Sequence, residues 1–123
     1  MKALVIDDSR AIRRILVKTL KELDIEVVEA AHGQEALDKL ESGEATVDLI
    51  MVDWNMPEMN GYDFIVAVRG KEQFSEIPIM MVTTESEMSQ MTRAIEAGAT
   101  EYLMKPFTKE MIAEKLDLMG ISI

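Results

Sequence analysis

Five short apolar runs alternate along the chain with amphipathic stretches, and polar or turn residues close each run. Runs of this length are typical of buried strands, whereas the spacing of Ile12, Leu16 and Leu20 indicates one face of a helix. Alternation of the two patterns predicts five βα units and therefore a parallel sheet. The expected strands cover residues 2–6, 25–30, 48–52, 77–82 and 100–104.

Helix signals fill the intervals between the expected strands. Ser9 is placed to cap the first helix, and Gly43 and Gly98 are placed to end the second and the fourth. Helices are expected after Ser9, over residues 34–41, from Gly61 to about Gly70, through Met88, Met91 and Ile95, and after Thr108.

The order of the strands follows from the handedness of their connections. Right-handed crossovers place helices on both faces of the sheet, and five units usually wind outward from strand one in two directions. The predicted fold is therefore α/β and flavodoxin-like, a doubly wound (βα)5 parallel sheet in the order 2-1-3-4-5. Its crevice opens at the carboxyl ends of strands one and three, where the winding reverses.

Five polar residues stand at the ends of the apolar runs and should converge on that crevice: Asp7, Asp8, Asp53, Thr83 and Lys105. Any one strand-end aspartate is most often a cap or turn residue. Three carboxylates at one point repel one another unless they share a cation. Oxygen ligands on loops favour Mg²⁺ held together with a phosphoryl group.

Composition narrows the class of protein. A chain of 123 residues suits one domain, and a net charge of −10 opposes binding to nucleic acid or anionic membranes. The chain has no cysteine and one histidine, His32, so a metal would need oxygen ligands. No signal peptide or membrane span follows Met1. We expect a cytoplasmic protein and a monomer.

The sequence resembles the receiver domains of two-component response regulators, and most closely the single-domain chemotaxis members. The matching segments are VIDDS, VDWNMPEMNGYDF around Asp53, PIMMVTTE at Thr83 and EAGATEYLMKPFT at Lys105. The resemblance implies one receiver domain over residues 1–123 with no effector domain. It also implies a signalling phosphoprotein, not an enzyme, that catalyses only its own phosphorylation and dephosphorylation.

The resemblance assigns a role to each residue of the acidic cluster. Asp53 would be the nucleophile that accepts a phosphoryl group from the histidine of a partner kinase. Asp8, Asp53 and the backbone carbonyl of Asn55 would hold Mg²⁺, with Asp7 orienting a bound water. Lys105 would supply a cation to a phosphoryl oxygen, aimed by a cis bond to the proline that follows it.

The resemblance also implies a switch and a set of partners. Thr83 would move toward the phosphoryl group, and Tyr102 would then change the output surface made by the fourth helix, fifth strand and fifth helix. Asn55 and Glu85 would lie beside the path of the water that removes the phosphoryl group. The implied partners are a CheA-like histidine kinase, a flagellar motor switch protein or other output protein, and possible phosphatases.

Three other classes of protein share either this fold or these residues. A haloacid-dehalogenase-like phosphatase needs a second acid two residues after the nucleophile, where this chain has Asn55. A flavodoxin would meet repulsion between its flavin phosphate and the acids after strand one. A single-domain phosphorelay carrier would have the same site, so the sequence leaves it open. Thr84 and Glu58 depart from the receiver pattern, and Arg13 fits either a docking face or a solvated helix face.

Overall fold

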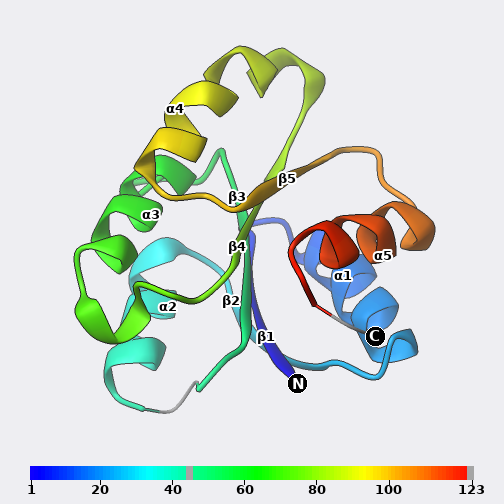
Figure 1. Cartoon of the computed structure of the whole chain (residues 1–123), viewed down its shortest axis with the longest axis horizontal. Coiled ribbons are helices and arrows are strands. Elements are labelled where there is room, and N and C mark those ends of the chain that lie inside the picture. The colour runs from blue at the N-terminus through cyan, green and yellow to red at the C-terminus, as the bar shows by residue number, and fades with distance from the viewer. Residues whose placement is uncertain (44–45, 122–123) are drawn as a thin grey trace.

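The computed structural model describes residues 1–43 and 46–121 and shows a five-stranded parallel sheet in the order β2-β1-β3-β4-β5 (Figure 1). The predicted fold class and strand order are therefore confirmed. The register pairs Ile6 with Val52 across β1 and β3, so the two central strands end side by side. The strands are β1 (Lys2–Ile6), β2 (Glu26–Ala30), β3 (Leu49–Asp53), β4 (Ile79–Thr83) and β5 (Glu101–Met104).

Side chains cap the helices at the positions that the sequence favours. Ser9, Asn60 and Thr108 each accept a hydrogen bond from a backbone N–H in the first helical turn, and the Nδ1 atom of His32 does the same at Glu35. The helices are α1 (Arg10–Glu22), α2 (Gly33–Glu41), α3 (Gly61–Arg69), α4 (Met91–Ala97) and α5 (Lys109–Leu118), with short 3-10 helices η1 (Glu72–Phe74) and η2 (Glu85–Gln90).

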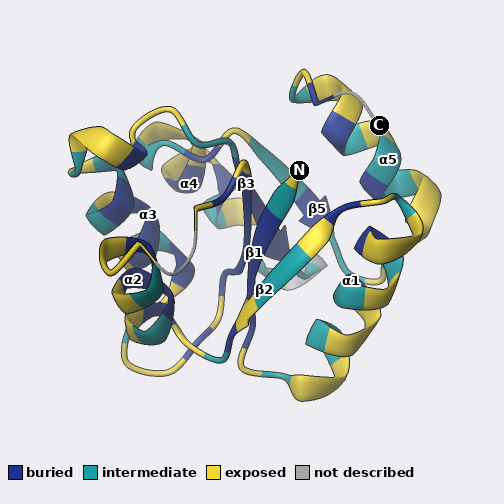
Figure 2. Cartoon of the chain, turned by 90° about the horizontal axis from the view of Figure 1, so that it is seen from below, coloured by how far each residue is buried: buried dark blue, intermediate teal, exposed yellow. Residues whose placement is uncertain are grey.

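Helices cover both faces of the sheet (Figures 1 and 2), and a hydrophobic cluster lies between the sheet and each helix layer. Leu4 and Ile50 point to the face covered by α2, α3 and α4, where Phe64 is fully buried. Their neighbours in the strands point to the other face, toward Leu16 of α1 and Leu116 of α5. Both faces of the sheet are covered, so its carboxyl edge remains as the place where polar side chains of the strand ends gather.

The five strands and five helices lie where they were predicted, with differences of one or two residues at several strand and helix starts. Two further differences bear on the site. Strands β3 and β4 extend one residue further than expected, so that Asp53 and Thr83 close their strands. The α-helical part of the fourth helix begins at Met91, because the preceding residues form η2, in which the N–H of Glu87 donates to the carbonyl oxygen of Thr84. Met88 lies in η2, and its side chain is outside the described part of the structure. Among the described residues, the helices are too short and too polar to cross a bilayer.

Candidate functional site

Three carboxylates meet at the carboxyl edge of the sheet. Asp7 follows β1 and is fully buried, Asp53 ends β3 and is 4% exposed, and Asp8 is exposed. One carboxylate oxygen from each residue lies within 4.8 Å of the others. Because β1 and β3 are neighbours, the strand order itself produces this juxtaposition.

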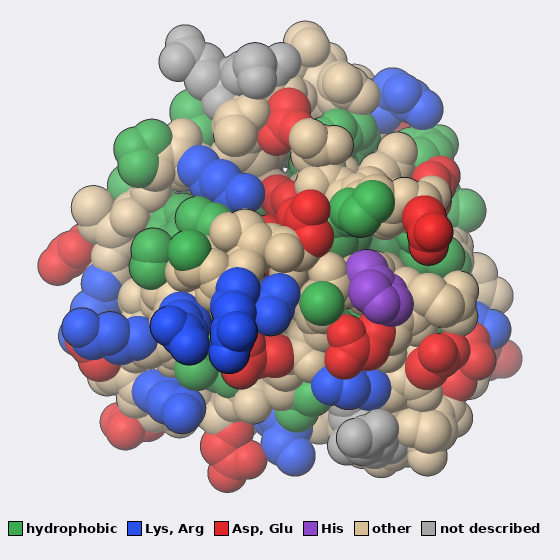
Figure 3. Space-filling view, turned by 180° about the vertical axis from the view of Figure 1, so that it is seen from behind, with side chains coloured by type: hydrophobic (Ala, Val, Ile, Leu, Met, Phe, Trp, Pro, Cys, Tyr) green, Lys and Arg blue, Asp and Glu red, His purple; other side chains and the backbone are tan. Residues whose placement is uncertain are grey.

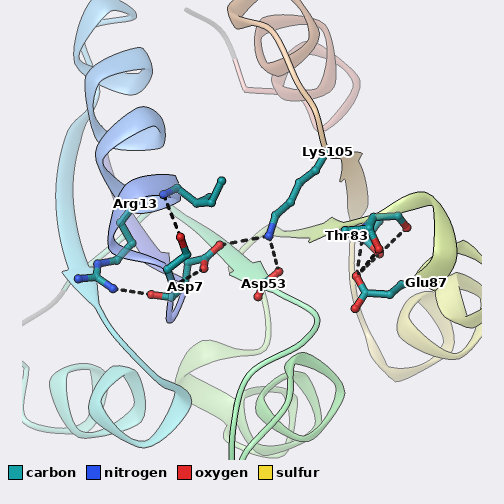
Figure 4. A network of polar contacts seen from close by, with 9 residues as sticks. Asp7, Arg13, Asp53, Thr83, Glu87 and Lys105 are labelled. Atoms are coloured by element: carbon teal, nitrogen blue, oxygen red, sulfur yellow. Dashed lines mark hydrogen bonds and ion pairs between the residues drawn. The ribbon is translucent and has the colours of Figure 1, made fainter.

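Lys105, in the loop after β5, reaches into the acidic cluster (Figure 4). Its Nζ donates a hydrogen bond to Asp53 Oδ1 at 3.0 Å and lies 3.6 Å from Asp7 Oδ2. Its backbone N–H donates to the carbonyl oxygen of Thr83 at 2.6 Å, and its bond to Pro106 is cis. The residue is thus fixed at its backbone, and its ammonium group lies between two buried acids.

The electrostatics of the site are unbalanced. Burial raises the pKa of Asp53 to about 6; the hydrogen bond from Lys105 opposes this rise, and the charge of Asp7 adds to it. Burial likewise raises the pKa of Asp7 against the hydrogen bond from the backbone of Ser9. Burial alone would lower the pKa of Lys105, but its hydrogen bond and attraction to Asp53 outweigh burial and raise it. One ammonium group therefore compensates only part of the negative charge.

Hydrogen bonds fix the side chain and the backbone of Asp7, yet one of its carboxylate oxygens lacks a hydrogen bond. Oδ1 accepts from the backbone N–H of Ser9 at 2.8 Å, and Arg13 Nη1 donates to the backbone carbonyl oxygen of Asp7. Oδ2 is buried and has no hydrogen-bond partner within the described structure. Lys105 Nζ is its ion-pair partner at 3.6 Å, beyond hydrogen-bond distance. A buried acceptor without a hydrogen bond is costly, so the site fits a hydrated cation whose water would donate to this oxygen.

Arg13 has a structural role that sequence reasoning left undecided. Besides Asp7, it contacts Glu29 of β2, with 3.3 Å between Nε and Oε1. No sequence pattern indicates this contact, because it depends on how α1 lies against β2. Figure 3 shows basic side chains gathered next to acidic ones on the face seen from behind.

The other predicted residues lie at varying distances from the cluster. Thr83 is fully buried, but its hydroxyl is directed toward Glu87 and not toward Asp53 (Figure 4). Tyr102 is partly buried, with Lys115 Nζ 4.1 Å from the centre of its ring. Asn55 is exposed in the loop after β3. The backbone of Glu85 lies in η2, and its side chain falls outside what the structure describes.

Sequence reasoning missed Glu87. Its Oε1 accepts hydrogen bonds from the backbone N–H and the hydroxyl of Thr84, both at 3.0 Å, and lies 3.4 Å from the hydroxyl of Thr83. Thr84, which departs from the receiver pattern, is therefore the main contact of Glu87. The spacing Thr84-x-x-Glu87 is that of a side-chain cap, and this was the signal available in the sequence.

A doubly wound parallel sheet with acids and a lysine at its carboxyl edge defines a receiver-type signalling domain. The chain belongs to the response regulator receiver domain family, whose model matches residues 3–117. It is 47% identical over 120 residues to chemotaxis protein CheY1 of Helicobacter pylori, covering 97% of this chain and 96% of that protein. It is 45% identical over 122 residues to the CheY homolog of Campylobacter jejuni, covering 98% and 93%.

Solved structures show the same relationship. Chemotaxis response regulator CheY4 of Vibrio cholerae matches with a TM-score of 0.86 and 39% identity, over 96% of this chain and 97% of that one. A putative response regulator from Chloroflexus aurantiacus matches with a TM-score of 0.88 and 29% identity, over 97% of each chain. The chain is thus a response regulator of two-component signalling, homologous to chemotaxis CheY proteins.

Proposed function

We propose that Asp53 accepts a phosphoryl group from the phosphohistidine of a partner kinase. A carboxylate oxygen of Asp53 attacks the phosphorus, the bond from phosphorus to the imidazole nitrogen breaks, and the imidazole leaves with the electron pair. The observation that carries the proposal is that Asp53 is a buried carboxylate at a strand end, hydrogen-bonded by Lys105 at 3.0 Å. This nucleophile is oriented and partly desolvated before the donor arrives.

The acidic cluster is the proposed Mg²⁺ site. Asp8, Asp53 and the backbone carbonyl of Asn55 would hold the ion, and Asp7 would orient its water. The convergence of three carboxylates and the unsatisfied Oδ2 of Asp7 support this assignment. When bound, Mg²⁺ neutralises charge on the oxygens of the transferred group. Lys105 would then exchange its bond with Asp53 for one with a phosphoryl oxygen, as a point charge on a flexible stem.

Thr83 and Tyr102 are the proposed switch. The new phosphoryl oxygens are strong acceptors, so the hydroxyl of Thr83 would turn toward them and leave room near β5. Tyr102 packs at its edge against the cluster that includes Met91 of α4, which couples the ring to the α4–β5–α5 surface. Asn55 and Glu85 would set how readily water reaches the phosphorus and so how long the phosphorylated state lasts.

We place this switch in chemotaxis, with a CheA-like kinase as donor, a flagellar motor switch protein as the output partner, and a phosphatase acting on the phosphorylated state. The support is that relatives of matching length are named chemotaxis proteins. Transfer of the phosphoryl group from Asp53 to a second histidine, in place of binding an output protein, would instead identify a phosphorelay carrier.

Acetyl phosphate with Mg²⁺ tests the chemistry directly. We expect intact-mass measurement to show one added phosphoryl group, stable in acid and lost in base as an acyl phosphate is, and none in Asp53→Asn. Asp38→Asn, at an exposed position of α2, is the matched control and should label like the parent. Equal labelling of Asp53→Asn would place the acceptor elsewhere.

A further inference from the structure

Glu87 lies four residues after Thr83 in η2, and the proposed chemistry gives it no role. Its carboxylate oxygen Oε1 collects three donors: the backbone N–H of Thr84, the hydroxyl of Thr84 and the hydroxyl of Thr83 (Figure 4). The two contacts with Thr84 are both 3.0 Å long, so they fix the carboxylate against the start of η2. Glu87 is thereby held beside the switch hydroxyl.

The hydroxyl of Thr83 is held loosely by comparison. It lies 3.4 Å from Glu87 Oε1 and 3.3 Å from the backbone carbonyl oxygen of Thr84, whereas O–H···O bonds are usually about 2.7–2.8 Å long. The side chain is fully buried, so water does not offer a competing acceptor. Both acceptors within reach of the hydroxyl lie on the η2 side, away from Asp53.

A hydroxyl donates one hydrogen bond at a time, so the two directions exclude each other. A Thr83 proton given to Glu87 or to the Thr84 carbonyl is not available to a phosphoryl oxygen at Asp53. We propose that Glu87 is a positioning residue for the switch: its carboxylate, anchored on Thr84, holds the Thr83 hydroxyl in the unphosphorylated position and competes with the phosphoryl group for it. This inference rests on the proposed function of Asp53 and Thr83.

The competition has a measurable consequence. While Glu87 retains the hydroxyl, Thr83 is turned toward Asp53 in only a fraction of the molecules. Only this fraction binds a phosphoryl mimic with all of its contacts, so the apparent affinity for the mimic is reduced in proportion. The long contact distances make the hold weak enough for a charged phosphoryl oxygen to displace it. Removing the carboxylate should therefore shift the protein toward its phosphorylated conformation without touching the acidic cluster.

The test uses the full chain with Mg²⁺ and beryllofluoride, a phosphoryl mimic, in isothermal titration calorimetry. We expect Glu87→Ala to bind beryllofluoride about three- to tenfold more tightly than the parent. Glu87→Gln, which keeps the shape and an acceptor oxygen but loses the charge, should fall between the two. Glu96→Gln removes a carboxylate from an exposed position of α4 and should match the parent.

A second pair of variants separates positioning from loosening of η2. In a Thr83→Ala background the hydroxyl is gone, so Glu87→Ala should change the affinity no further. An equal gain in that background, or unchanged or weaker binding in both Glu87 variants, would overturn the role of Glu87. Parent protein that neither binds beryllofluoride nor labels with acetyl phosphate would instead overturn the proposed function, and the positioning role with it.

Discussion

Buried charge is the dominant feature of the site at the scale of single residues. Asp7 and Asp53 are both buried, and within the described structure the only ion-pair partner of their carboxylates is Lys105. Desolvation raises the pKa of each acid, so the folded protein tolerates these carboxylates at a cost in stability. Binding of a cation would reduce this cost, so the site favours the uptake of positive charge.

The cost should appear as a pH-dependent gain in stability in Asp53→Asn. The pKa of Asp53 rises from 3.8 in its ordinary state to about 6 in the folded protein. Between those values the folded protein binds the proton more tightly than the unfolded chain, so stability falls as pH rises and the full penalty applies above about pH 6. We expect Asp53→Asn to gain roughly 1–3 kcal/mol at pH 7.5 and little at pH 4.

Urea denaturation at the two pH values, with a chelator present, measures this gain. Asp38→Asn, an exposed aspartate of α2, is the control and should change little at either pH. An equal gain of Asp53→Asn at both pH values, or a loss at pH 7.5, would contradict the assignment of the cost to an ionised Asp53.

Trp54 reports on cation binding. It directly follows Asp53, is 6% exposed and packs edge to face with Tyr62, with 6.3 Å between ring centres. We expect Mg²⁺ to change its fluorescence and Asp8→Ala to weaken the Mg²⁺ affinity about tenfold or more, because a ligand is lost. Glu58→Gln removes a nearby acid that does not belong to the cluster and should keep the response. An unchanged titration in Asp8→Ala would refute the metal assignment.

At the scale of elements, the turn from β3 into α3 fixes Asp53. The N–H of Gly61 donates to the carbonyl oxygen of Trp54 at 2.9 Å, and a Cβ at Gly61 would lie 2.7 Å from the carbonyl oxygen of Asp53. Asn60 caps the helix that starts there. Only a residue without a side chain lets α3 begin this close to the strand that carries Asp53.

Gly61→Ala should therefore disturb stability and chemistry together. The clash is with backbone atoms, so we expect a loss of about 1–3 kcal/mol in urea denaturation and slower labelling by acetyl phosphate. Gly70→Ala is the control, since its Cβ would meet carbonyl oxygens at ordinary distances of 3.4 and 3.6 Å. Normal labelling of Gly61→Ala would show that the turn does not position Asp53.

Apolar periodicity predicted the strands and helices but not the exact residues at which some of them end. Because Asp53 and Thr83 are polar, the predicted third and fourth strands stopped one residue before them. The pairing between strands continues through both residues. The apolar spacing around Met91 predicted one helix, whereas the contacts between Thr84 and Glu87 produce a 3-10 turn before it. Such short-range polar contacts are decided by side-chain geometry that periodicity does not contain.

At the scale of the whole molecule, topology explains why so much of the site was predictable. In a doubly wound sheet every strand ends at the same edge, so strand-end residues that are far apart in sequence, such as Asp7, Asp53 and Lys105, must come together. The direction of the Thr83 hydroxyl and the contact of Arg13 with Asp7 were not predictable, because they depend on rotamers within a packed core. The fold therefore brings the strand-end residues together, and side-chain packing sets the direction of the Thr83 hydroxyl.

Phosphoryl binding at Asp53 should change the conformation of β5 and so of the output surface. Amide NMR spectra of the labelled protein, recorded with Mg²⁺ before and after adding beryllofluoride, test this most directly. We predict shifts at Asp53, at Thr83 and Thr84, and along β5 around Tyr102, with none of them in Asp53→Asn. Shifts confined to the acidic cluster, with the amides of β5 unchanged, would contradict the claim that this site controls the output surface.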